Sequence, residues 1–280
     1  VSEVRNLAAN GVVEIMVVSQ NTSDFGRDTG ENLLQLVTEL SKVDGIIWIR
    51  LLYLYPGIIK TEDFLKIMST DKIVPYLDMP IQHASPNLLR AMNRPFDINK
   101  TKKLFHDLRN MNPAITLRTT ILLGFPGEEE SDIELTADLM NEIRFDHLGT
   151  YRYSPEEGTS GAKLELTVDQ EEVVDREARL MALQSEHSLQ RQLGRKNSDQ
   201  LLLIDSIEPD THWKELISDF PESGLLLNQS VAVARSVNLG YEIDGVVLLD
   251  ATNLQAGQWV NAKLVDVTAY DAFAVQNTED

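Results

Sequence analysis

Strand-length apolar runs alternate with amphipathic segments through the first 155 residues, and this alternation restricts the possible fold more than any other feature. The runs are rich in β-branched residues and cover Val13–Asn21, Trp48–Pro56, Val74–Gln82, Thr116–Gly127 and His147–Pro155. The segments between them carry apolar residues at helical spacing. Near-continuous apolar strands that alternate with helices are typical of a parallel sheet with helices outside it. The pattern therefore predicts an α/β fold with a barrel-like or open sheet.

The pattern changes after a long charged helix, which we predict from about Thr167 to about Lys196. Short β runs separated by turn residues follow, and their number and spacing suit a small all-β barrel. These runs are Leu201–Ile207, Ser230–Ser236, Gly245–Asp250, Gln258–Ala269 and Ala272–Gln276. We predict two domains, residues 1–198 and 199–280.

Acidic residues outnumber basic ones, and the excess is concentrated in the second region. The chain has 44 Asp and Glu against 25 Lys and Arg, which gives a net charge of −19. Residues 201–280 alone hold 13 acidic and 3 basic residues, a net charge of −10. This balance opposes non-specific binding to nucleic acid and is compatible with a basic protein partner. Because no membrane-length apolar run and no targeting segment is recognised, we expect a cytoplasmic protein.

The sequence contains no cysteine, which excludes several kinds of chemistry for these 280 residues. They can form no disulfide, no thiolate nucleophile and no cysteine-held zinc or iron–sulfur site. His83 has no second His at ligand spacing, which favours a hydrogen-bonded structural histidine over a metal ligand. The motifs of dinucleotide-binding folds, P-loop proteins, common serine hydrolases and zincins are also absent.

Polar residues at the carboxyl ends of the predicted strands are the candidates for a binding site, because ligands bind there in α/β sheets. Gln20 lies near the end of the first run, where it could equally begin a turn, and Gln82 is the last residue of the third. Arg118 and Thr119 lie in the fourth run. A guanidinium within an apolar strand needs a partner, which is either Asp78 or the carboxylate of a ligand.

A tight loop, Gly124–Gly127, precedes a predicted helix. Its backbone N–H groups could hold an anion or a cofactor carboxylate. Glu128 begins the acidic first turn of that helix, where negative charge suits the helix dipole, so structure alone explains this residue. Tyr53 and Tyr55 end the second run, and we expect them to pack against the sheet or cap it.

Six sequence blocks follow one another in a specific order and spacing: VVSQNTSDFGRD, WIRLLYLYP, YLDMPIQHAS, MNRP, LRTTILLGFPGE and FDHLGTYRYSPEEGT. This order and spacing resemble those of the radical-SAM methylthiotransferases. IRLLYLYP, RFDHLGTYRYSPEEGT and YEIDGVVLLD favour the branch that acts on ribosomal protein S-twelve over the tRNA-modifying branch. The resemblance covers residues 1 to about 196 as a partial TIM-type (β/α) barrel and about 199 to 276 as a TRAM-type, OB-like β-barrel. Relative to the usual barrel of this family, Glu208–Asn228 resembles an insertion whose role the sequence does not indicate.

The resemblance implies a radical reaction that uses S-adenosyl-L-methionine. In this family a 4Fe-4S cluster held by a C-x3-C-x2-C loop cleaves S-adenosylmethionine to a 5′-deoxyadenosyl radical, and a second cluster supplies or carries the sulfur. A methylthio group is then installed on the β-carbon of an aspartate of the ribosomal protein. In the family the cysteine loop follows the first barrel strand, which would lie upstream of Val1. We therefore expect a fragment of a longer enzyme that binds no cluster and is inactive alone.

The resemblance also implies a role for each candidate residue, although it assigns no catalytic side chain. Gln20 and Gln82 would lie at the S-adenosylmethionine pocket, and Arg118, with Thr119 beside it, would bind the methionyl carboxylate. Gly124–Glu128 would line the adenosine side. The acidic barrel would contact the basic small-subunit ribosomal protein. A tRNA methylthiotransferase, which the barrel's charge disfavours, and a non-catalytic protein-binding module remain the alternatives.

Overall fold

The computed structural model describes residues 1–94, 96–159, 161–165, 167–220 and 230–277. The chain divides into two compact units, Val1–Gln184 and Ser185–Asp280. This division falls inside helix α7 (Gln170–Leu193), upstream of the domain limit at residue 198 that the sequence predicts; that limit stays a prediction. In the part of the chain that the structure describes, no helix has the length and apolar character needed to cross a membrane.

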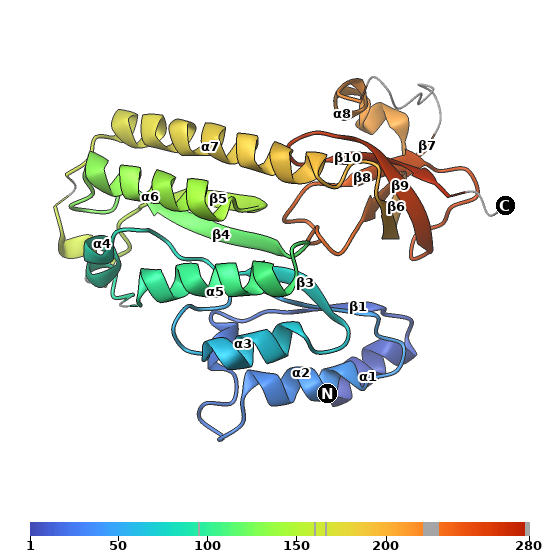
Figure 1. Ribbon diagram of the computed structural model, residues 1–280, viewed down its shortest axis with the longest axis horizontal. Helices are drawn as coiled ribbons and strands as arrows, with labels where there is room; N and C mark the ends of the chain where they lie inside the picture. The colour runs from blue at the N-terminus through green and yellow to red at the C-terminus, as the bar shows by residue number, and fades with distance from the viewer. Residues whose placement is uncertain (95, 160, 166, 221–229, 278–280) are drawn as a thin grey trace. The chain divides into compact units, whose positions relative to one another are not determined.

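A parallel five-stranded sheet lies at the centre of the first unit, in the order β1-β2-β3-β4-β5 (Figure 1). Its strands are β1 (Glu14–Val17), β2 (Trp48–Leu51), β3 (Ile73–Asp78), β4 (Thr116–Leu123) and β5 (His147–Arg152). The predicted α/β class is confirmed. Each strand is shorter than the apolar run that predicts it and ends a few residues before the run does. The last residues of each run leave the sheet and form the loops at its carboxyl edge.

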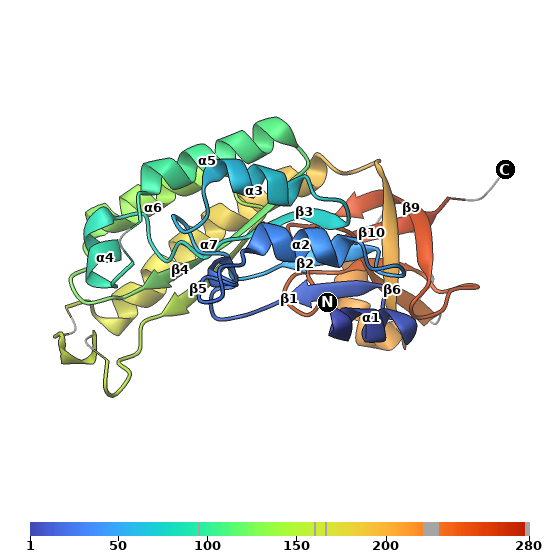
Figure 2. The same cartoon turned by 90° about the horizontal axis from the view of Figure 1, so that it is seen from below.

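Helices connect the strands and cover one face of the sheet; α2, α3, α5 and α6 follow one another across it (Figures 1 and 2). The helices before α7 are α1 (Ser2–Ala9), α2 (Leu33–Ser41), α3 (Thr61–Met68), α4 (Pro86–Ala91), α5 (Ile98–Met111) and α6 (Glu130–Ile143). Short 3-10 helices lie at η1 (Thr22–Asp24) and η2 (Gly161–Lys163). Alternate strand residues such as Ile49, Leu77 and Leu117 are fully buried in the core on the helical side.

The residues between them point to the other face of the sheet, and several are polar. Arg50 is fully buried, and its Nε donates to Glu14 Oε1 at 3.2 Å. The Arg50 guanidinium lies 4.5 Å from the centroid of the Tyr76 ring, which stacks on His147 with centroids 6.2 Å apart. This buried ion pair and its aromatic neighbours occupy the sheet interior, whereas a pocket opens at the carboxyl ends of the strands.

The second unit is a closed five-stranded β-barrel in the order β10-β8-β7-β6-β9, as the sequence predicts. Its strands are β6 (Asp199–Pro209), β7 (Ser230–Arg235), β8 (Val247–Asp250), β9 (Trp259–Val267) and β10 (Ala272–Gln276). Leu202, Ala232 and Ala262 are fully buried in its core. The short helices η3 (Asp210–His212) and α8 (Lys214–Ser218) fall in the predicted insertion, of which residues 221–228 lie outside the described residues.

Candidate functional site

Each strand of the first unit, or the loop that follows it, contributes side chains to one pocket of about 200 Å³. The lining residues are Gln20, Tyr53, Leu54, Tyr55, Pro80, Gln82, Arg94, Arg118, Thr120 and Tyr151. Three of the residues that the sequence predicts as cofactor ligands, Gln20, Gln82 and Arg118, are therefore brought together. The pocket occupies the edge of the sheet at which α/β proteins bind ligands.

Asp78 connects two residues of this pocket. Its carboxylate is buried; Oδ1 accepts a hydrogen bond from Arg118 Nη1 at 2.9 Å, and Oδ2 accepts one from the Tyr53 backbone N–H, also at 2.9 Å. Of the two partners that the sequence leaves open for Arg118, the structure shows Asp78. An arginine–aspartate pair is neutral as a whole, so this pair adds no net charge to the pocket.

Two non-glycine residues of the pocket have left-handed backbones. Tyr53 has a φ of 54°, and Gln82 has a φ of 67°. Hydrogen bonds hold both conformations: Asp78 accepts from the Tyr53 amide, and Gln82 donates to the Thr120 carbonyl at 2.9 Å and accepts from the Leu122 amide at 2.8 Å. Such conformations cost about 1–3 kcal/mol each and cluster at ligand-binding sites. Their presence supports this pocket as the functional site.

Arg94 also lines the pocket, and it was not singled out from the sequence. Its Cζ lies 5.5 Å from the centroid of the Tyr55 ring, and no carboxylate within the described residues forms an ion pair with it. Burial raises the pKa of Tyr55, and the nearby Arg94 charge opposes that shift only in part. The phenol is therefore neutral at neutral pH. The signal that could have identified Arg94 is its place in the MNRP block.

Thr119 is a predicted site residue that does not line the pocket. Its side chain is fully buried on the helical side of β4. The hydroxyl donates to the Met79 carbonyl at 2.9 Å and accepts from the Ile81 amide at 3.2 Å. Thr119 thus holds the segment that follows β3, through the Met79 carbonyl and the Ile81 amide. Its position beside a cofactor stays a prediction.

The loop after β4 is likewise held by the protein itself. The Gly124 amide donates to Glu128 Oε2 at 3.0 Å, and the Gly127 amide donates to Thr167 Oγ1 at 2.8 Å. Glu128 is buried, and its Oε1 accepts from Arg176 Nη1 of α7 at 2.7 Å. None of Gly124, Gly127 and Glu128 lines the pocket, so their assignment to the adenosine side stays a prediction.

His83 lies close to this loop. It is fully buried, its Nδ1 accepts a hydrogen bond from the Ser85 amide at 3.0 Å, and its Nε2 lies 3.6 Å from Glu128 Oε2. This hydrogen bonding agrees with the structural role that the sequence favours. Among the residues that the structure describes, no group of three or more His, Cys, Asp or Glu is arranged to hold a metal ion. Without cysteine, the residues of this chain do not fit a 4Fe-4S cluster.

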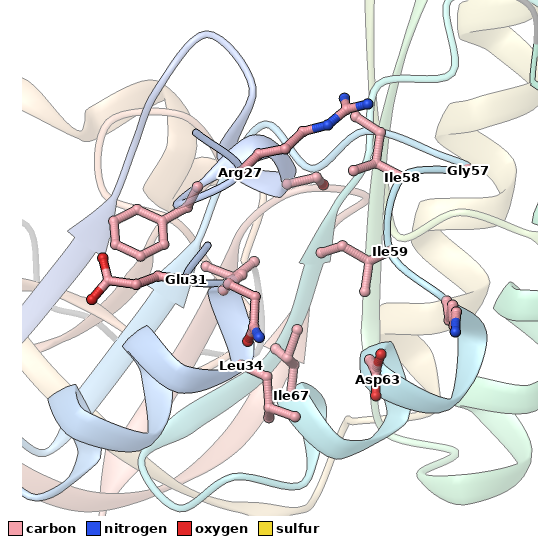
Figure 3. A pocket seen from close by; sticks show the side chains of 13 residues that line it. Arg27, Glu31, Leu34, Gly57, Ile58, Ile59, Asp63 and Ile67 are labelled. Carbon is pink, nitrogen blue, oxygen red and sulfur yellow. The ribbon is translucent and has the colours of Figure 1, made fainter. Parts of the chain in front are cut away.

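A larger cavity of about 500 Å³ lies between the loop after β1 and the loop after β2 (Figure 3). Leu34, Ile59 and Ile67 form part of its wall. Arg27 at its rim pairs with Asp24 at 3.2 Å, but both side chains are largely exposed, so this pair contributes little. No predicted site residue lines this cavity, and the smaller pocket remains the candidate site.

Comparison with known proteins identifies the superfamily of this chain. Residues 1–140, half of the chain, match the radical SAM superfamily. Curated relatives from Desulfitobacterium hafniense, Syntrophomonas wolfei and Pasteurella multocida are 36%, 35% and 34% identical over 272, 274 and 291 residues. The alignments cover 96%, 96% and 97% of this chain and 57%, 58% and 60% of the relatives. All three relatives are named ribosomal protein uS12 methylthiotransferase RimO. The chain therefore spans less than two thirds of their length and belongs to the radical SAM superfamily.

Proposed function

We propose that this chain forms the S-adenosylmethionine- and substrate-binding part of a methylthiotransferase that modifies the β-carbon of an aspartate in ribosomal protein S12. The observation that carries the proposal is the pocket that joins Gln20, Gln82 and Arg118 at the carboxyl edge of a radical-SAM sheet. The names of the relatives support the substrate, and the resemblance of the sequence blocks supports the aspartate.

The pocket fits one end of S-adenosylmethionine. Its volume of about 200 Å³ is below the roughly 300–1,000 Å³ of pockets that enclose a whole small molecule. The methionyl end carries a carboxylate and an ammonium group, and the pocket offers a guanidinium, side-chain amides and phenols as partners. We propose that Arg118 orients the carboxylate while Gln20 and Gln82 bind polar groups beside it. When bound, S-adenosylmethionine supplies the methyl group and the hydrogen-abstracting radical of this reaction.

The iron–sulfur clusters that the superfamily implies have no ligands in this chain, because its 280 residues include no cysteine. We propose that the thiolates come from polypeptide outside these residues. In this proposal, the chain binds the methionyl end of the cofactor and presents the substrate to the cofactor.

The β-barrel of the second unit suits a basic protein substrate. Residues 201–280 carry a net charge of −10. One of their three cations, Arg235, is buried, and its Nε donates to Asp205 at 2.7 Å, so it adds little positive potential at the surface. We propose that this TRAM-like barrel attracts the basic ribosomal protein electrostatically. The same charge disfavours tRNA, whose phosphates require cations. A ribosomal substrate would place the reaction in the cytoplasm.

The test uses the complete product of the gene that encodes this chain. We would reconstitute it anaerobically with iron and sulfide and supply a reductant, S-adenosylmethionine and ribosomal protein S12. The expected product is S12 in which a methylthio group replaces one hydrogen of an aspartate, detected by tandem mass spectrometry. S12 with asparagine at that position is the matched control and should stay unmodified. Modification of tRNA adenosine with S12 unchanged would overturn the proposal.

A further inference from the structure

Arg94 gives the candidate pocket a net positive charge. Arg118 is neutralised by Asp78, with 2.9 Å between Nη1 and Oδ1. Arg94 has no ion pair and no side-chain hydrogen bond among the described residues, although its guanidinium lines the pocket. A net positive pocket stands out in a chain whose charge is −19. Such a pocket favours an anionic ligand group.

The backbone around Arg94 is fixed. Helix α4 ends at Ala91, and Asn93, with a φ of 57°, turns the chain out of the helix. The Arg94 amide donates to the Leu89 carbonyl at 2.8 Å, and the Arg94 carbonyl accepts from the Phe96 amide at 2.8 Å. The Cα of Arg94 is therefore anchored on both sides, and only its side chain has to adjust to a ligand.

Tyr55 forms a support for the guanidinium. Its ring lies 5.5 Å from Arg94 Cζ and meets the Phe96 ring edge-on, with centroids 6.0 Å apart. The Tyr55 amide donates to Ser23 Oγ at 2.8 Å, which holds the residue in the loop after β2. An arginine supported by the face of an aromatic ring keeps the N–H donors in the plane of its guanidinium available, and a carboxylate can accept two of them side by side.

We propose that Arg94 binds the side-chain carboxylate of the substrate aspartate and selects aspartate over asparagine. This inference rests on the proposed function for the identity of the substrate. The position of the two arginines distinguishes their ligands: Arg118 belongs to β4, whereas Arg94 lies in the connection between α4 and α5, beyond the strand ends. A side chain that enters from a protein substrate meets Arg94, and the methionyl carboxylate meets Arg118.

The test measures binding, so it does not depend on a loaded cluster. Titration calorimetry of the 280-residue chain compares S12 peptides that carry aspartate or asparagine at the modified position. Charge-assisted hydrogen bonds predict that the aspartate peptide binds the unaltered chain about tenfold to a hundredfold more tightly. Arg94→Gln should abolish this preference, and Arg94→Lys should retain part of it. Arg90→Gln, a change at an exposed arginine of α4, is the matched control and should leave the preference intact.

Two further measurements separate the outcomes. If Arg94→Gln lowers the affinity for S-adenosylmethionine and leaves the aspartate preference unchanged, Arg94 binds the methionyl carboxylate and the inference is overturned. N-acetylaspartate amide and N-acetylasparagine amide test the carboxylate site without S12. If the chain binds no S12 peptide but binds N-acetylaspartate amide through Arg94, the carboxylate site stands and the proposed substrate fails. If Arg94→Gln affects neither ligand, the inference fails. Circular dichroism of each variant checks that it is folded.

Discussion

Replacement of Glu128 by glutamine should destabilise the first unit strongly, because this carboxylate neutralises a buried arginine. Arg176 of α7 has a side chain that is only 3% exposed, and that of Glu128 is fully buried. The two groups are 2.7 Å apart, and Glu128 also accepts from the Gly124 amide. The substitution keeps the side-chain volume and removes the negative charge, so the buried guanidinium loses its buried partner.

The size of the effect follows from what remains around Arg176. Breaking a buried pair from one side costs about 3–5 kcal/mol. Glu172 and Glu130 also pair with Arg176, but their side chains are 49% and 47% exposed, so solvent screens both interactions. We therefore expect the lower end, about 3 kcal/mol, which is about a hundredfold in the unfolding equilibrium constant.

The assay is urea unfolding followed by hydrogen exchange of β4 peptides, which reports on the first unit alone. Glu39→Gln is the matched control, because Glu39 of α2 pairs with Lys42 and both side chains are more than half exposed. An exposed pair contributes only about 0–1 kcal/mol. If the two glutamine variants lose the same stability, the reasoning that burial makes the Glu128 pair costly to break is refuted.

Three further substitutions test other parts of the molecule. Gly124→Ala should lower the melting temperature more than Gly127→Ala. Both glycines have a positive φ, but only a methyl group at Gly124 would clash, because it would lie 2.7 Å from Val173 Cγ2. Equal shifts in melting temperature would contradict this prediction. Thr119→Val should cost about 1–3 kcal/mol in denaturant unfolding, because the buried Ile81 amide loses its acceptor, and an unchanged free energy of unfolding would contradict this. Burial raises the pKa of Asp271, so its stabilising contribution is present below the ordinary carboxyl pKa and is lost as pH rises through the raised pKa. Asp271→Asn should remove this pH-dependent part and stabilise the barrel at neutral pH, and a melting profile against pH with the same slope as the unaltered chain would contradict it.

The fold class was predictable because hydrophobic periodicity is a local property of the sequence. The strand limits were not. The run Trp48–Pro56 is apolar or aromatic apart from Arg50, yet β2 ends at Leu51 because Tyr53 turns into a left-handed conformation. The carboxylate of Asp78, 25 residues away, accepts a hydrogen bond from the Tyr53 amide and stabilises that turn. No local pattern contains this contact.

The candidate site was predictable in part, because Gln20 and Gln82 follow the ends of β1 and β3 and Arg118 is a charged residue within an apolar strand. Successive residues of a strand point to opposite faces, so Arg118 and Thr119 could not both face the pocket. The same alternation places Thr120 in the pocket lining instead. Arg94 was missed because it lies in a helix-to-helix connection, where no periodicity marks the side that a residue faces.

The mass of ribosomal protein S12 in cells that lack the gene tests the central claim most directly. In cells with the intact gene, we predict S12 that carries one methylthio group on an aspartate. Deletion should remove that group, and the reintroduced gene should restore it. If S12 has the same mass in both strains, or if deletion instead removes a methylthio group from tRNA adenosine, the assignment of this chain to ribosomal-protein modification is contradicted.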